Sequence, residues 1–321
     1  MPAPRITYVD AATLDAGDID FSPLETLGEL ILHRFTAPDE LIKHAGGSRI
    51  ILTNKFVLSR EGLTALAEHL RYVVVTATGV NNVDLDAARE LGIPVSNVSG
   101  YSTESVAQHT IGLLLNLATG IHRYAAEARL WAKSPMFTRL DHPIFELSGK
   151  TLGIVGLGTI GKRVAELAQS FGMRIIALAR GESNTEGPIP RLKREQFFAE
   201  ADAITLHCPL TAENERFINA ETIEMIKSGA VLINTGRGPL VDEIAVLDAL
   251  KSGKLGGAGL DVLPVEPPPA DQQLLTADLP NLIVTPHSAW ASVESRTRLL
   301  DGVCENIRAF LADEEIPNRV A

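Results

Sequence analysis

Residues 151–161 read Thr151-Leu-Gly-Ile-Val-Gly156-Leu-Gly158-Thr-Ile-Gly161. The apolar residues before Gly156 predict a buried strand, and the amphipathic residues 164–171 predict a helix after the turn. Gly156 permits a tight turn, Gly158 lets a phosphate approach the backbone, and Gly161 lets the helix pack closely on the strand. The helix N-terminus adds free N–H groups and the positive end of its dipole. We therefore predict that this segment binds the pyrophosphate of a dinucleotide.

Composition and charge narrow the class of protein. The chain has 321 residues, 45% of them apolar, which suffices for two domains with ordinary cores. The net charge is −11, without a cluster of Lys and Arg, so we expect neither nucleic acid nor a membrane as a partner. The longest apolar stretch, residues 110–118, is too short to span a bilayer, and the N-terminus lacks a signal-peptide core. Cys208 and Cys304 have no metal-binding spacing, so we predict a cytoplasmic protein without a metal site.

Strand-like and helix-like segments alternate along the chain, which predicts an α/β fold with parallel sheets. We predict two domains of Rossmann-like or flavodoxin-like type. Residues 102–124 are predicted to form one long apolar helix, buried between the domains or against a second subunit. The last helix, residues 293–311, follows the second array of strands and is placed back on the first domain. The substrate domain is therefore discontinuous, with residues 1–98 and 289–321, and the dinucleotide-binding domain, residues 99–288 with the long helix, is inserted into it.

The second array of predicted strands starts at the glycine motif. Its predicted strands are residues 152–155, 174–178, 203–207, 231–235, 258–262 and 282–285, and its predicted helices are residues 161–171, 221–227 and 242–250.

Three strands of this array are followed by side chains suited to catalysis. Arg237 lies between two glycines, Glu266 precedes two prolines, and His287 follows Pro286. Since ligands bind outside the carboxyl ends of parallel strands, we expect the three side chains at the edge that holds the dinucleotide. Taken alone, Glu266 is better explained as an exposed turn residue and His287 as a structural histidine, and Arg237 could be an ordinary surface arginine. Their shared placement favours a site.

These residue types suit the transfer of hydride from a nicotinamide to a ketone. Arg237 offers positive charge to the developing alkoxide, and His287 is a natural proton donor near neutral pH. Glu266 beside the imidazole would orient the ring and favour its cation. His207, which ends a neighbouring strand, is a candidate for lining the cofactor cleft.

Two strands of the first array end in turns that could bind a carboxylate. Residues 50–53 lead to Asn54 and Lys55, and residues 72–76 lead to a glycine turn at Gly79. Backbone N–H groups exposed at such a turn bind anions. A plain turn beside a solvated lysine explains the same pattern equally well.

Six segments together resemble the D-isomer-specific 2-hydroxyacid dehydrogenase family, and the similarity covers essentially the whole chain. Within the family, the sequences of residues 76–84, 97–102 and 287–292 are similar to those of the glycerate dehydrogenase/hydroxypyruvate reductase subgroup. The six segments are residues 78–84, 156–161, 205–211, 234–242, 259–266 and 286–290.

The resemblance implies an NAD(P)-dependent D-2-hydroxyacid dehydrogenase that reduces small 2-keto acids such as hydroxypyruvate and glyoxylate. It implies that Arg237 binds and polarises the keto acid, that His287 is the acid/base, and that Glu266 supports the histidine. It also implies a homodimer built by the helix that starts at Ser102.

The resemblance further implies where substrate and cofactor bind. Gly79 and Val80 would hold the substrate carboxylate with Asn54 and Lys55 nearby, and Trp290 would shape the pocket. Asp261 and Thr235 would contact the nicotinamide-ribose end. The candidate cofactor contacts are Val106, Gly156, Leu157, Gly158, Thr159, Ile160, Gly161, Arg180, His207, Cys208, Pro209, Thr235, Gly236, Arg237, Asp261 and His287.

The end of the second strand bears on the choice of cofactor. NAD-specific sites place an acidic residue there for the ribose hydroxyls, but residues 174–179 end without one and Arg180 follows. A carboxylate would repel a 2′-phosphate, whereas an arginine attracts it. We therefore favour NADP(H). NAD(H) remains the alternative, with Glu182 reaching the ribose.

One departure from the family and two rival classes remain. Many members read Val-Ala-Glu-His where this chain reads Val106-Ala-Gln108-His109, and we expect this to change a local contact only. Formate or phosphite dehydrogenases share the architecture, but the formate enzymes have Gln in place of Glu266. A cofactor-sensing, corepressor-like binding protein would keep every motif, although no extended tail supports this class.

Overall fold

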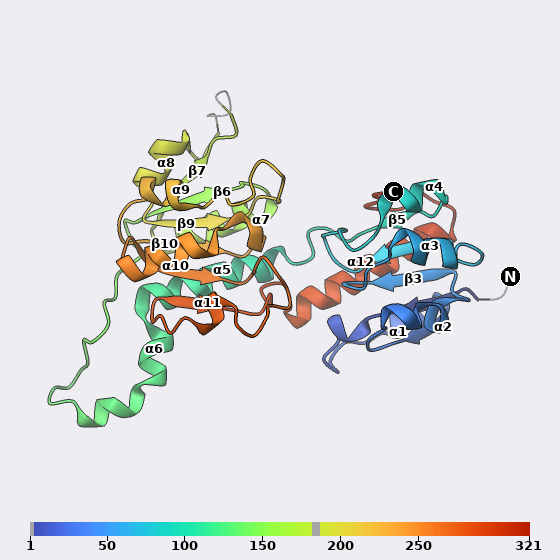
Figure 1. Cartoon of the computed structure of the whole chain (residues 1–321), viewed down its shortest axis with the longest axis horizontal. Coiled ribbons are helices and arrows are strands. Elements are labelled where there is room, and N and C mark those ends of the chain that lie inside the picture. The colour runs from blue at the N-terminus through green and yellow to red at the C-terminus, as the bar shows by residue number, and fades with distance from the viewer. Residues whose placement is uncertain (1–2, 182–186) are drawn as a thin grey trace. The chain divides into compact units, whose positions relative to one another are not determined.

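The computed structural model describes residues 3–181 and 187–321, which form two compact units. Unit 1 consists of Met1–Ser102 and Trp290–Ala321, and unit 2 consists of Thr103–Ala289 (Figure 1). The chain therefore leaves unit 1 after its first sheet and returns to it for the final helix. Glu182, which was the alternative ribose ligand, lies outside the described residues.

Unit 1 is a five-stranded parallel sheet in the order β2-β1-β3-β4-β5, which is the flavodoxin-like order. Every residue of β3 and β4 is buried, because helices and loops cover both faces of the sheet. The C-terminal helix α12 packs on this sheet. The strands and α-helices are β1 (Arg5–Tyr8), α1 (Ser22–Glu25), β2 (Glu29–Leu32), α2 (Leu41–Ala45), β3 (Ile50–Thr53), α3 (Arg60–Leu66), β4 (Tyr72–Val75), α4 (Leu85–Glu90), β5 (Val95–Ser96) and α12 (Val293–Leu311).

Unit 2 is a seven-stranded parallel sheet in the order β12-β11-β10-β9-β6-β7-β8. The chain passes from β6 to β7 on one side and later returns to β9 on the other, so the strand order reverses beside β6. Ligands of open parallel sheets bind at such a switch point, outside the carboxyl ends of the strands. The strands are β6 (Thr151–Val155), β7 (Arg174–Leu178), β8 (Arg191–Leu192), β9 (Ala203–Leu206), β10 (Ala230–Asn234), β11 (Leu255–Leu260) and β12 (Leu282–Val284).

The helices of unit 2 correct two predictions. The long helix predicted over residues 102–124 is broken at Gly120, whose φ of 63° ends one helix before the next begins. A helix and a short edge strand between β7 and β9 were not predicted. The α-helices are α5 (Thr103–Thr119), α6 (Ile121–Ala126), α7 (Thr159–Ser170), α8 (Arg194–Glu200), α9 (Ala220–Met225), α10 (Glu243–Ser252) and α11 (Gln273–Thr276).

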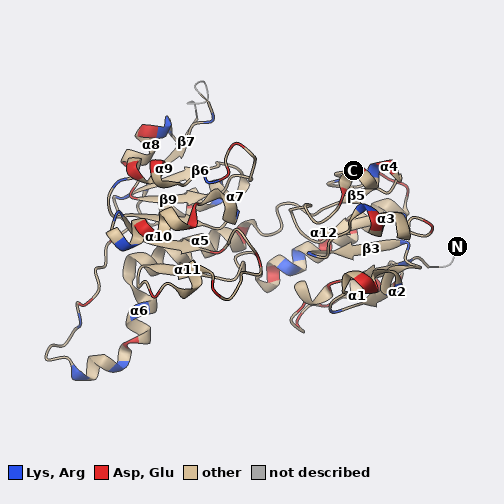
Figure 2. Ribbon diagram, in the orientation of Figure 1, with Lys and Arg blue, Asp and Glu red and all other residues tan. Residues whose placement is uncertain are grey.

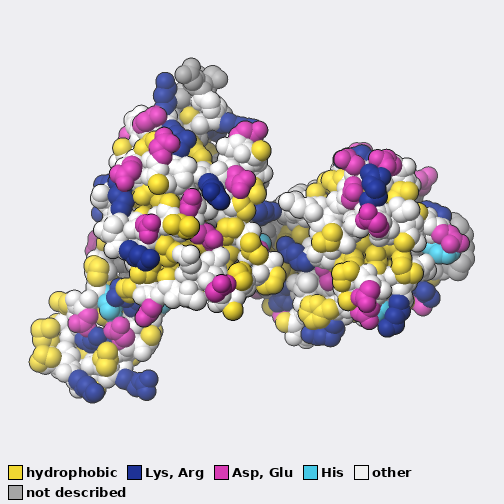
Figure 3. Space-filling model, viewed as in Figure 1, with side chains coloured by type: hydrophobic (Ala, Val, Ile, Leu, Met, Phe, Trp, Pro, Cys, Tyr) yellow, Lys and Arg dark blue, Asp and Glu magenta, His cyan; other side chains and the backbone are white. Residues whose placement is uncertain are grey.

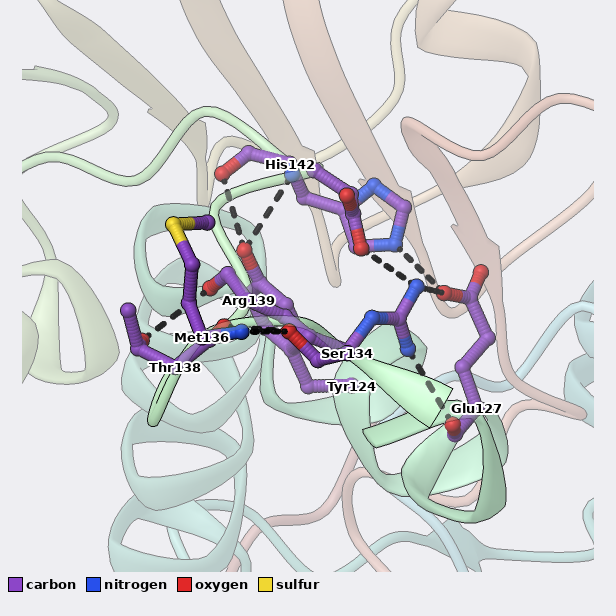
Figure 4. Close-up of polar contacts among 8 residues, drawn as sticks. Tyr124, Glu127, Ser134, Met136, Thr138, Arg139 and His142 are labelled. Atoms are coloured by element: carbon purple, nitrogen blue, oxygen red, sulfur yellow. Dashed lines mark hydrogen bonds and ion pairs between the residues drawn. The ribbon is translucent and has the colours of Figure 1, made fainter. Parts of the chain in front are cut away.

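Residues 121–145 form an arm that projects from the sheet of unit 2 (Figure 1). Figure 4 shows that polar contacts hold the arm together from within. The Glu127 carboxylate accepts from Arg139 at 3.0 Å and lies 3.0 Å from His142 Nε2. The Tyr124 hydroxyl donates to the His142 carbonyl at 3.2 Å and accepts from its N–H at 3.1 Å. These bonds give the arm a defined shape although it has no buried apolar residue in α6 or in the turn that follows.

Three general properties of the described residues bear on function. None of their helices is long and apolar enough to cross a membrane. They contain no group of three or more His, Cys, Asp and Glu side chains that could hold a metal ion. Acidic and basic side chains are interspersed over both units (Figure 2).

Candidate active site

The glycine turn after β6 has the close contacts that a dinucleotide cradle requires. Gly156 has a φ of 95°, and a Cβ there would lie 2.6 Å from Cys208 N. A Cβ at Gly161 would lie 2.2 Å from the Gly156 carbonyl oxygen, so this glycine lets α7 pack on the turn. Gly158, the N-cap of α7, faces open space, because a Cβ there would meet nothing within 4 Å. The residues therefore fit a pyrophosphate at the N-terminus of α7.

The remaining candidates of this loop lie where a cofactor can reach them. Gly158 and Thr159 are exposed, and Leu157 and Ile160 are half-buried. On the other side of the turn, Cys208 Sγ lies 3.9 Å from the Asn214 side-chain nitrogen, and burial raises the pKa of this thiol. Pro209 after it is exposed.

His207 is next to this turn and is half-buried. Burial lowers the pKa of His207 to about 4, so its imidazole is neutral at pH 7. Its Nε2 is buried without a hydrogen-bond partner among the described residues. His207 can therefore offer a neutral ring to the cleft and is no source of positive charge for the phosphates.

Arg237 follows β10 in a turn that a buried side chain closes. Asn234 donates from Nδ2 to the Arg237 carbonyl at 2.9 Å and accepts from the Gly236 N–H at 3.0 Å. The Arg237 side chain is exposed, and its Nη1 donates to the Gly236 carbonyl at 2.8 Å. A Cβ at Gly238 would lie 2.0 Å from the Leu263 carbonyl carbon, so only glycine lets this turn pack on the loop that leads to Glu266.

Glu266 and His287 form a pair across the loops after β11 and β12. His287 Nδ1 lies 2.6 Å from Glu266 Oε2, and each side chain is about one-third exposed (31% and 34%). The other carboxylate oxygen, Oε1, accepts from the Leu263 N–H at 2.9 Å. Because a carboxylate only accepts, Nδ1 carries the proton, and Nε2 is the ring nitrogen left to meet a substrate.

Asp261 and Thr235 have partners that their predicted cofactor role did not include. Asp261 is buried, and its carboxylate accepts from the Ser288 N–H at 3.0 Å and the Ala289 N–H at 2.9 Å. Thr110 in α5 donates its hydroxyl to the Val106 carbonyl at 2.8 Å, so Thr235 donates to Thr110 at 3.0 Å. Both side chains thus support the site, and their contact with a cofactor stays a prediction.

In unit 1, a buried carboxylate occupies part of the predicted anion site. Asp10 accepts from the backbone N–H groups of Asn54, Lys55 and Phe56 at 2.6–3.1 Å. These N–H groups are therefore not available to a substrate carboxylate, and only the side chains of Asn54 and Lys55 remain candidates. Asp10 was not among the predicted site residues, although it follows the end of a strand like the other candidates.

The second turn of unit 1 is different. The backbone N–H groups of Gly79 and Val80 donate to no other residue among those described, and both residues are half-buried. Two adjacent unpaired N–H groups are suited to a carboxylate. Trp290 packs edge-to-face on Tyr101 with ring centroids 6.3 Å apart.

The position expected to select between NAD(H) and NADP(H) follows strand β7. Arg180 is exposed two residues after β7 ends, and no acidic side chain occupies the end of that strand. Gly181 is the last described residue before the gap at 182–186.

Comparisons with known proteins identify the family of this chain. The family model for the D-isomer specific 2-hydroxyacid dehydrogenase NAD binding domain matches residues 111–289. The hydroxypyruvate reductase of Blautia hydrogenotrophica is 40% identical over 96% of this chain and 97% of that protein. The glycerate dehydrogenase of Methylorubrum extorquens is 39% identical over 96% of each. The apo-structure of D-lactate dehydrogenase from Escherichia coli has a TM-score of 0.86 at 32% identity and covers 99% of this chain and 100% of that chain. The chain therefore belongs to the D-isomer-specific 2-hydroxyacid dehydrogenase family, whose members are oxidoreductases of 2-hydroxy and 2-keto acids with a nicotinamide cofactor.

Proposed function

We propose that this protein reduces small 2-keto acids, with hydroxypyruvate and glyoxylate as the first candidates, to D-2-hydroxy acids. The observation that carries the proposal is the Glu266–His287 pair at 2.6 Å, at the sheet edge where Arg237 and the glycine turn also lie. The names of the two relatives above support the choice of substrates.

The chemistry divides among three side chains. A bound nicotinamide supplies the hydride. Arg237 attracts the keto acid and stabilises negative charge that develops on its carbonyl oxygen. His287 donates a proton from Nε2 to that oxygen, so its ring must carry protons on both nitrogens before the reaction. Glu266 accepts from Nδ1 and stabilises this imidazolium form. The unpaired N–H groups of Gly79 and Val80 are assigned to the substrate carboxylate.

A steady-state panel of 2-keto acids with NADPH and NADH tests the function. We expect turnover of hydroxypyruvate and glyoxylate to products of D configuration. Turnover confined to formate or phosphite would replace the proposal with the rival dehydrogenase class. Binding of NADPH without turnover of any of these compounds would instead favour a cofactor-sensing binding protein.

Arg180 carries our proposal that NADPH is the preferred cofactor. A charge-assisted hydrogen bond contributes roughly 1.5–3 kcal/mol, so Arg180→Ala should weaken NADPH binding by about 10- to 150-fold. NADH lacks the 2′-phosphate and should bind about equally to the wild-type protein and to Arg180→Ala. Fluorescence titration measures both dissociation constants.

Arg174→Ala serves as the matched control for this experiment. Arg174 is the first residue of β7, at the end of the strand opposite to Arg180, and it pairs with Glu200 at 2.6 Å, so its loss should leave both affinities unchanged. Equal losses of NADH and NADPH affinity in Arg180→Ala would contradict the assignment.

We further propose that the arm of residues 121–145 binds a second copy of this chain. Apolar side chains gather on its surface (Figure 3), including Phe137, Leu140 and Trp131 at 90%, 73% and 58% exposure. Exposed apolar patches of this kind mark interaction surfaces. The internal hydrogen bonds of the arm hold this surface in one shape for a partner.

Sedimentation equilibrium tests the dimer. The wild-type chain should show twice its mass of 34.5 kDa, and Phe137→Asp should shift it toward the monomer. Phe35→Asp changes an equally apolar residue that is 69% exposed in unit 1 and should stay dimeric. A wild-type monomer, or identical behaviour of the two variants, would refute this role of the arm.

A further inference from the structure

The segment 285–289, which carries His287 at its centre, is bonded to helix α5 near both of its ends. Ser105 donates from its hydroxyl to the Ala289 carbonyl at 2.6 Å. His109 Nε2 lies 3.0 Å from Thr285 Oγ1. Ser105 and His109 are four positions apart in α5, so they lie on the same face of the helix. One face of α5 therefore spans the segment that holds the candidate acid.

The direction of the hydrogen bonds in this cluster follows from Asp261. Thr285 Oγ1 lies 2.5 Å from Asp261 Oδ1 and donates its only proton there, because a carboxylate can only accept. Thr285 must then accept from His109, so His109 carries its proton on Nε2. The same imidazole nitrogen lies 3.5 Å from Asp261 Oδ1. The order of donation is therefore His109 to Thr285 to Asp261.

His287 needs this support because of its backbone conformation. Its φ is 51°, in the left-handed region that costs a residue with a side chain roughly 1–2 kcal/mol. The His287 N–H is held by the Asp261 carbonyl at 2.8 Å, and the next two N–H groups by the Asp261 carboxylate. If the segment relaxed, the imidazole would turn away from Glu266, and small displacements of a reacting group lower the rate strongly.

We infer that His109, with Ser105, is a positioning residue that holds His287 in its reactive orientation through Thr285 and Asp261. The inference rests on the proposed acid role of His287. His109 donates to Thr285 and not to His287, so we assign it an indirect role, acting on the segment from α5.

Kinetics of two variants at one position test the inference. His109→Phe keeps a flat ring but removes the donor, and we expect kcat for hydroxypyruvate to fall about tenfold, the effect of one lost hydrogen bond. The dissociation constant of NADPH should stay within about twofold of wild type. His109→Gln places an N–H donor close to the position of the imidazole Nε2 and should recover most of kcat. Gln108→Ala, an exposed neighbour on α5, is the matched control and should not change kcat.

A second readout requires no substrate. In protein labelled with [15N]histidine, the His287 signals are identified by their loss in His287→Gln. They should shift in His109→Phe and keep their wild-type positions in His109→Gln and Gln108→Ala. Should His109→Phe fail to fold, Thr285→Val, which replaces a hydroxyl by a methyl group, is expected to produce the same shift.

The two readouts separate this inference from the proposed function. A wild-type protein without turnover of 2-keto acids overturns the proposed function. Shifted His287 signals in His109→Phe would still support the role of His109 in positioning the segment. Unshifted signals in both His109→Phe and Thr285→Val overturn the inference. The inference is also overturned if His109→Phe lowers the melting temperature but leaves the His287 signals and kcat as in wild type, because His109 would then serve stability alone.

Discussion

His287→Ala is expected to lower kcat for 2-keto acid reduction by about 10²- to 10⁴-fold, the usual contribution of a positioned general acid. NADPH affinity should remain within about twofold of wild type, since the glycine turn that we assign to the phosphates is built by other residues. The loss should fall on kcat, because the proton is transferred in the reaction step and contributes little to substrate binding. Single-turnover kinetics with bound NADPH measure this step directly.

His69→Ala is the control for this experiment, because His69 is an exposed histidine of unit 1 with 54% of its side chain accessible. It should have wild-type kcat. An unchanged kcat in His287→Ala would remove His287 from the acid role and would leave Glu266 without its assigned function.

Arg237→Gln should have the second large effect, and it should act on binding as well as on rate. Loss of a charged hydrogen bond to the substrate costs roughly 1.5–3 kcal/mol, and loss of a donor to the developing alkoxide costs roughly 2.7–4 kcal/mol. Together these predict a fall in kcat/KM of about 10³- to 10⁵-fold. The measurement is steady-state kinetics with hydroxypyruvate at saturating NADPH.

Arg237→Lys separates charge from geometry. Lysine keeps the charge but lacks the planar fork, so its kcat/KM should lie between those of wild type and Arg237→Gln. The melting temperature should change little in either variant, because the Arg237 side chain is exposed and bonds only to the adjacent Gly236 carbonyl among the contacts described. An effect confined to the melting temperature would refute the assignment.

Much of the fold could be predicted because its signals are local. The glycine motif, the buried strands and the final helix each lie in one short segment, and the structure confirms the two parallel sheets. The prediction of one helix over residues 102–124 was wrong because the apolar pattern continues through Gly120, whereas its left-handed backbone does not. Helix α8 was missed between two strands that were both recognised.

The candidate site was only partly predictable, for a related reason. A residue type after a strand end indicated where Arg237, Glu266 and His287 would lie, and the structure joins the last two at 2.6 Å. Nothing local shows whether a backbone N–H is already used. Only the folded unit 1 shows that Asp10 has taken the N–H groups after β3, while those of Gly79 and Val80 remain unpaired within the described chain.

Short patterns along the chain were thus sufficient for the family and for the two parallel α/β sheets, and they indicated His287 as the candidate acid. The orientation of that acid depends on bonds between distant segments. Ser105 and Ala289 are 184 positions apart, and His109 and Thr285 are 176 apart. Such partners share no periodicity or motif, because they meet only when α5 packs against the sheet of unit 2, and the left-handed backbone of His287 is stable only within that packing.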